Sequence, residues 1–223
     1  MNRSINILLM CLNIPALFFT ILVAFEIPLF MLRIDDVSLQ STVYYVFAIL
    51  MLLLMFRRTA SRWVGISMMA KPEKFLWSAP VSGERKKNVR LYLGMETSVA
   101  LFSLLVVTAL TPSAWPLAIA YAYMVLDQLI FTFFAPKYYR VGITKKAVVV
   151  VDREVRILYF SGLRRVDVQQ QTFYFDYIEE LQLFFPTNCI VDSAIQEFKE
   201  KLQEQVNTDT VFFTERFKAL THA

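Results

Sequence analysis

The chain has few of the residues from which enzymes usually build active sites. It contains one histidine, His222, and two cysteines, Cys11 and Cys189, in 223 residues. One cysteine lies in an apolar run and the other in the polar tail, so neither a disulfide nor a zinc-type spacing is expected. The fingerprints of nucleophile elbows, phosphate-binding loops, zinc proteases and dinucleotide-binding domains are all missing. The sequence therefore predicts no catalytic residue, no metal site and no cofactor.

Four long apolar runs dominate what is present. They cover Ile7–Leu32, Thr42–Phe56, Leu91–Leu110 and Trp115–Ala135. Each is close to the ~20 apolar residues that cross a bilayer core of about 30 Å, although the second reaches this length only with Gln40 and Ser41. The turn near Pro112 is tight and pairs the last two runs. The sequence thus predicts an α-helical integral membrane protein, with four transmembrane helices in two hairpins at residues 1–56 and 91–135.

The link between the hairpins, residues 57–90, is strongly basic. Its nine basic residues, against two acidic ones, are Arg57, Arg58, Arg62, Lys71, Lys74, Arg85, Lys86, Lys87 and Arg90. Lys and Arg accumulate on the cytoplasmic side, and the opposite loops carry Arg33 with Asp35 and Asp36, or no charge at all. This predicts that both termini are cytoplasmic, with two short turns on the outer side.

The charge of the link also indicates a partner. The net charge of +4 does not indicate nucleic acid, because the basic residues lie where topology requires them. We expect contacts with anionic lipid headgroups from Arg57, Arg58, Arg62, Lys86, Lys87 and Arg90. Trp63, Ile66 and Met69 share one helical face after the first arginines, which favours an interfacial helix in the headgroup layer. The alternative is that this face packs against the tail.

The tail, residues 136–223, changes from continuous to alternating apolar residues. Alternation with a period of two predicts an antiparallel meander, with strands around 139–143, 147–151, 155–159, 166–168, 173–177 and 181–185. The apolar residues of 195–206 then recur at helical spacing. The last segment, 207–223, is compatible with a strand, a helix or a membrane-surface segment.

This pattern resembles that of the bacterial PH-like-domain membrane proteins. The stretch that carries the resemblance is Tyr138–Val206, above all Phe173–Phe185 followed by Ile195–Val206. The resemblance implies a C-terminal α+β PH-like domain on the inner side of a bacterial plasma membrane. It also implies a binding or scaffolding module, because that family has no shared catalytic residues.

Three carboxylates lie inside the apolar runs. Placing an ionisable group in a membrane-spanning helix costs free energy, so such a residue usually has a structural or functional role. Counting from the turn at Pro112 places Glu96 and Asp127 within about one helical turn of each other. Asn13, Gln128 and Tyr123 can lie at a similar depth and complete a polar site. The pair could relay protons or bind a cation, or it could join helices as polar contacts, which is the interpretation we favour. The third acid, Glu26, can pair with Tyr44 or Tyr45 in a structural role.

The sequence leaves three classes of function open. The first is a non-enzymatic membrane scaffold, regulator or accessory subunit whose tail binds a protein or lipid partner, or a second copy of the chain. The second is a small proton- or cation-coupled transporter or channel component that uses Glu96 and Asp127. The third is a membrane enzyme that acts on a lipid.

Overall fold

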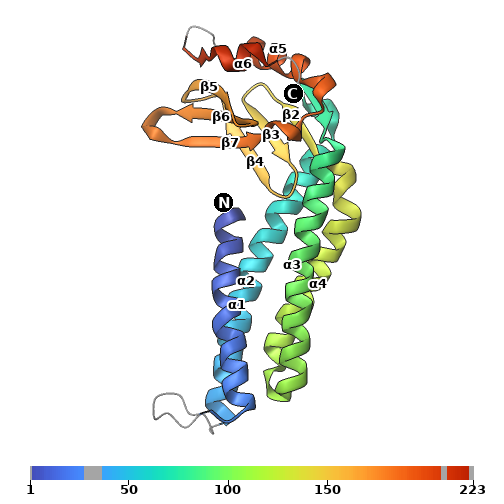
Figure 1. Cartoon of the computed structure of the whole chain (residues 1–223), viewed down its shortest axis with the longest axis vertical. Helices are drawn as coiled ribbons and strands as arrows, with labels where there is room; N and C mark the ends of the chain where they lie inside the picture. Colours follow the sequence, from blue (N-terminus) through green and yellow to red (C-terminus); the bar gives the residue numbers. More distant parts are fainter. Residues whose placement is uncertain (1, 28–36, 207–209, 221–223) are drawn as a thin grey trace. The chain divides into compact units, whose positions relative to one another are not determined.

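The chain folds into two units. A computed structural model describes residues 2–27, 37–206 and 210–220. The first unit comprises Met1–Ser61 and Leu91–Phe134, and the second comprises Arg62–Arg90 and Ala135–Ala223. The first is a helical bundle, and the second contains all the strands of the described chain (Figure 1).

Four long helices contain the four apolar runs: α1 (Asn2–Ala24), α2 (Val37–Met69), α3 (Gly83–Leu110) and α4 (Trp115–Phe134). Each is long and apolar enough to cross a membrane. The 33 residues of α2 extend about 50 Å at 1.5 Å per residue, which exceeds a bilayer core of about 30 Å. The expected interfacial helix after Arg57 is therefore no separate element, because α2 continues unbroken to Met69.

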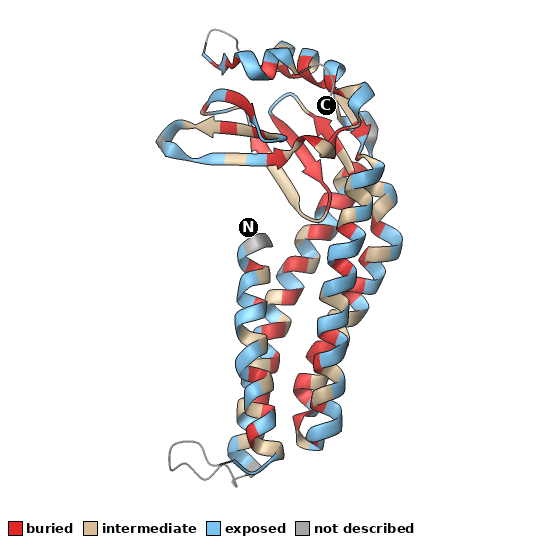
Figure 2. Ribbon diagram, in the orientation of Figure 1, coloured by how far each residue is buried: buried red, intermediate tan, exposed pale blue. Residues whose placement is uncertain are grey.

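The helices of the first unit pack as two antiparallel pairs. A one-turn 3₁₀ helix, η2 (Pro112–Ala114), joins α3 to α4 at the predicted tight turn. The core contains small and large residues from all four helices: Ala16, Tyr44, Ala48, Met51, Val107, Ala114, Leu117, Ala120 and Tyr121. The outside is just as apolar, since Leu53, Phe102 and Phe133 are 63%, 65% and 75% exposed (Figure 2). A bundle with this exterior is stable in lipid rather than in water.

Seven serine and threonine hydroxyl groups within these apolar helices are satisfied locally. Each donates to the backbone carbonyl four residues earlier, which hides its polarity from lipid. The residues that do so are Thr20, Thr42, Thr97, Ser98, Ser103, Thr108 and Thr132.

The second unit contains two four-stranded sheets. One has the order β1 (Trp77–Pro80), β2 (Arg140–Ile143), β3 (Ala147–Val151) and β4 (Val155–Tyr159). The other has the order β7 (Gln182–Pro186), β6 (Thr172–Tyr177), β5 (Leu163–Gln169) and β8 (Phe212–Phe213). All pairs are antiparallel except β5 with β8. The six predicted tail strands are thus confirmed.

Strand β1 was not predicted, and it joins the basic link to the tail. Trp77 lies opposite Ile143 and Pro80 opposite Arg140, so β1 is an edge strand of the first sheet. Proline is tolerated there because an edge strand needs fewer ladder hydrogen bonds. The helices α3 and α4 lie, in sequence, between the two paired strands β1 and β2. The link and the tail, predicted as separate segments 57–90 and 136–223, therefore share one unit from Arg62 onward.

Aromatic side chains fill the interior between the second sheet and the C-terminal helices. Helix α5 (Ile195–Gln205) places Phe198 against Phe173 and Phe185, with ring centroids 5.4 and 6.2 Å apart. Helix α6 (Glu215–Ala219) adds Phe217, 6.2 Å from Phe173. The buried Lys199 ammonium donates to the carbonyls of Lys218 and Leu220 at 2.7 and 2.9 Å. The last described segment is therefore strand β8 followed by helix α6, held against α5.

Candidate intramembrane polar site

The predicted acids meet around an arginine that lies inside the helical bundle. The Arg58 side chain is only 1% exposed, and its Nη1 lies 3.7 Å from Oε2 of Glu96. Its Nη2 lies 3.7 Å from Oδ2 of Asp127. Nη1 also donates to Oδ1 of Asn6 at 3.2 Å. One guanidinium thus links α1, α2, α3 and α4.

Each carboxylate of this cluster also accepts a hydrogen bond from an uncharged side chain. Gln128 donates from Nε2 to Oε2 of Glu96 at 2.7 Å. Thr59 donates from Oγ1 to Oδ1 of Asp127 at 2.8 Å. Buried charges are tolerated when they are paired and their remaining lone pairs are hydrogen-bonded. We call the set of Asn6, Arg58, Thr59, Glu96, Asp127 and Gln128 the charge network.

The position of Arg58 differs from the sequence-based expectation of a headgroup contact. Because α2 is continuous, Arg57 and Arg58 point to different sides of the same helix, and only Arg57 is exposed. Arg62 follows one helical turn after Arg58 and is also buried, at 3% exposure. Lys87 and Arg90 are exposed on α3, and Lys86 is half-buried. Helical periodicity around Arg57–Arg62 could have distinguished the exposed face of Arg57 from the buried face of Arg58 and Arg62. No local sequence pattern identifies the acids that Arg58 contacts.

Asn13 and Tyr123 lie outside the charge network. Asn13 accepts hydrogen bonds from the Tyr121 hydroxyl and, at 3.3 Å, from Ser103. It is two helical turns along α1 from Asn6, about 10 Å, so it forms a second polar level. Tyr123 packs against the apolar cluster of Ile5, Leu9 and Met55.

Glu26 is exposed at the end of α1, with a left-handed φ of 51°. Its expected partners are engaged elsewhere in the described chain. Tyr44 is fully buried, with its ring 5.3 Å from that of Phe19. Tyr45 contacts Trp115, with ring centroids 5.6 Å apart. Arg33, Asp35, Asp36 and His222 lie outside the described residues.

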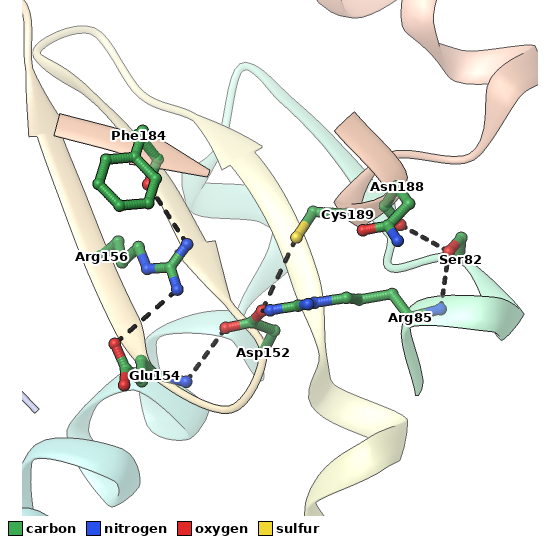
Figure 3. Close-up of polar contacts among 8 residues, drawn as sticks. All are labelled: Ser82, Arg85, Asp152, Glu154, Arg156, Phe184, Asn188 and Cys189. Carbon is green, nitrogen blue, oxygen red and sulfur yellow. Dashed lines mark hydrogen bonds and ion pairs between the residues drawn. The ribbon is translucent and has the colours of Figure 1, made fainter. Parts of the chain in front are cut away.

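The second unit contains a buried polar cluster that sequence reasoning missed (Figure 3). Arg85 donates to Oδ2 of Asp152 from Nη2 at 2.6 Å and from Nε at 2.9 Å. The Cys189 thiol lies 3.7 Å from the same oxygen. Burial, and then the negative charge of Asp152, raise the pKa of the Cys189 thiol to about 12. The thiol is therefore protonated and serves as a buried hydrogen-bond donor rather than as a nucleophile.

A further polar cluster surrounds Asp167 on β5. Burial raises the pKa of this carboxyl, but hydrogen bonds from Thr214, Gln169, the Val168 amide and Arg165 lower it to about 2. The shortest is the 2.6 Å bond from the Thr214 hydroxyl. The carboxylate thereby anchors the segment that contains β8 and α6 to the second sheet. Arg165 and Arg216 border a hollow of about 350 Å³ beside it.

No cluster of three or more His, Cys, Asp or Glu side chains that could hold a metal ion occurs in the residues that the structure describes. Comparison with known proteins found no matching family model, no matching curated protein and no matching solved structure.

Proposed function

We propose that the chain is a non-enzymatic membrane scaffold, regulatory or accessory subunit that binds its partner through the second unit. The charge network is the observation that carries this proposal. Both acids of the network accept hydrogen bonds and lie beside Arg58, and with the bond from Arg58 to Asn6 these contacts connect all four helices. Acids that join helices stabilise the bundle. We therefore assign recognition of a protein or lipid partner to the surface of the second unit.

The second unit supports a PH-like assignment. The link supplies β1, so β1–β7 give seven antiparallel strands in two sheets, followed by helix α5. A strand meander followed by one amphipathic helix is the pattern on which the resemblance to bacterial PH-like-domain membrane proteins rests. We propose that this unit lies on the cytoplasmic side of a bacterial plasma membrane.

Exposed basic and aromatic residues agree with this orientation. Arg57 on α2 and Lys87 and Arg90 on α3 are exposed near the helix ends that lead into the second unit. Trp63 and Tyr92 are each 44% exposed on the same two helices. Basic residues and amphipathic aromatic rings both favour the headgroup layer. We propose that these residues contact anionic lipid.

Transport remains the second candidate, and one feature of the charge network favours it. Glu96 and Asp127 both lie 3.7 Å from the guanidinium of Arg58. Two carboxylates held around one site are groups that can bind a proton or a cation. The same acids would then carry an ion between helices.

One set of variants separates the two candidates. The full chain, tagged at its C-terminus, is extracted in mild detergent and analysed for stoichiometric partners, and is also reconstituted into liposomes for proton and cation flux. The scaffold proposal expects a stoichiometric partner and no flux, with Glu96→Gln and Asp127→Asn lowering thermal stability. Flux that either substitution abolishes while assembly stays intact would overturn it. Thr108→Ala, at an exposed hydroxyl of α3, is the matched control.

A further inference from the structure

The hairpin of β6 and β7 exposes large apolar side chains in the second unit. Figure 1 labels its two strands, and Figure 2 colours parts of them as exposed. Ile178, Leu181 and Phe184 are 50%, 53% and 44% exposed within seven consecutive residues. Tyr174 extends this surface, with its ring 5.8 Å from that of Phe184. The inner face of the same hairpin is occupied by the buried Phe173, Phe175 and Phe185. Apolar side chains on both faces exceed what a folded core requires, and such exposure marks interaction sites.

The charge of this hairpin is opposite to that of the chain as a whole. Residues 173–186 contain three acidic residues and no Lys or Arg, whereas the chain has a net charge of +4. Glu180 is exposed in the turn, and Asp176 on β6 accepts a hydrogen bond from Gln182 at 2.7 Å and lies 4.0 Å from Arg165. An anionic lipid surface would be repelled here, because like charges oppose approach. A partner with apolar and basic side chains fits both properties.

The geometry of β7 limits the way in which such a partner can bind. β7 is an edge strand, which could in principle accept an added strand. However, β7 ends at Pro186, which has no amide proton to donate. The carbonyl of Phe184 already accepts a hydrogen bond from Arg156 at 3.3 Å, as Figure 3 shows. Recognition must therefore go through side chains rather than through an extended ladder.

We propose that the β6–β7 hairpin docks a basic amphipathic segment of a partner protein. Its apolar residues pack on Ile178, Leu181 and Phe184, and its Lys or Arg side chains face Asp176 and Glu180. Aromatic anchors such as Phe184 and Tyr174 dominate binding energy in interfaces of this kind. The inference rests on the proposed function and names the class of partner and the surface that binds it.

Two synthetic peptides test the chemistry of the occupant. Both carry leucines at helical spacing, with lysine at every polar position in one and glutamate in the other. Each is titrated by fluorescence anisotropy against the full chain in maltoside micelles. We expect Leu181→Ser with Phe184→Ser to weaken binding of the basic peptide at least about tenfold, because hot-spot anchors are lost. Phe212→Ser, at another exposed aromatic of the second unit, should leave it unchanged.

Binding of the basic peptide that is insensitive to the double substitution overturns the proposal. The proposal is also overturned if the acidic peptide binds as tightly as the basic peptide and its binding depends on the hairpin. The micelle contributes equally to every variant, so these comparisons isolate the hairpin.

A photocrosslinking residue in place of Phe184, in native membranes, identifies the occupant directly. An adduct with a Lys- or Arg-rich amphipathic segment of another protein supports the proposal. An adduct with lipid or with a second copy of the chain overturns it. If the double variant retains a stoichiometric partner, the hairpin assignment fails while the proposed scaffold function stands. If no stoichiometric partner is found and the reconstituted protein conducts ions, both the hairpin assignment and the proposed scaffold function fail.

Discussion

The guanidinium of Arg58 lies 3.7 Å from the carboxylate of Asp127, and neither side chain is more than 4% exposed. Removing the arginine would leave the buried Asp127 and the half-buried Glu96 without their cation, which costs far more than the ion pairs themselves contribute. We expect Arg58→Ala to lower the free energy of unfolding by about 3–5 kcal/mol. Thermal denaturation in detergent, followed by size-exclusion chromatography, measures this loss.

The neighbour Arg57 supplies the control, because it is exposed on the same helix. Arg57→Ala should melt like the wild type. Replacing the whole set, with Arg58→Met, Glu96→Gln and Asp127→Asn, should recover much of the lost stability. If the Arg58→Ala and Arg57→Ala variants melt at the same temperature, the charge network does not contribute to the stability of the bundle.

Gly65 allows a close approach of α2 to β4 within the second unit. A Cβ placed there would lie 2.1 Å from Cγ2 of Val155. We expect Gly65→Ala to destabilise the protein by about 1–3 kcal/mol, through overpacking. Gly94→Ala is the matched control, since a Cβ at that helical glycine meets nothing within 4 Å. Adding Val155→Ala to Gly65→Ala should restore stability, and failure of this rescue would place the strain elsewhere.

Asp167 should make the second unit sensitive to acid. Its pKa is about 2 in the folded chain, below its ordinary value of 3.8, so its carboxylate stabilises the fold. That contribution, about 2 kcal/mol, is complete above pH 5 and is lost as the pH falls through 4 toward 2. Asp167→Asn should flatten the fall in melting temperature between pH 5 and pH 2.5, whereas Asp176→Asn, on the neighbouring strand, should not. Identical profiles for all three proteins would contradict the assignment.

Cys189 should resist alkylation while the second unit is folded. Its thiol is fully buried and its pKa is raised to about 12, so almost no thiolate forms at neutral pH. In a Cys11→Ser background, we expect N-ethylmaleimide to modify the folded chain at least about 100-fold more slowly than the unfolded chain. Mass spectrometry of timed samples measures this ratio. Rapid and complete labelling without denaturant would show that the cluster around Asp152 opens readily.

Hydrophobic patterning predicted those parts of the fold whose signals are local. Continuous apolar runs indicated the four long helices, and period-two alternation indicated the six strands of the tail. Counting from the turn at Pro112 also brought Glu96, Asp127 and Gln128 close together, as the bond between Gln128 and Glu96 confirms.

The remaining features depend on contacts between distant residues. Trp77–Pro80 is short and lies in a basic segment, and its partner strand comes about sixty residues later, so no local pattern marks it as a strand. By residue type alone, Arg58 cannot be distinguished from its exposed neighbour Arg57. The residues that it contacts lie on three other helices, and the sequence does not show which faces of those helices meet it. Asn13 was placed with the acids because depth alone does not fix which helix face a side chain occupies.

The pairing of β1 with β2 imposes an order on biogenesis. The two strands are separated in the chain by α3 and α4, so the first sheet can be completed only after the whole second helical hairpin has been synthesised. At roughly 5–20 residues per second, several seconds pass between the synthesis of β1 and that of β2. During this interval β1 has no partner strand, and an unpaired strand is a site at which a nascent chain can pair wrongly.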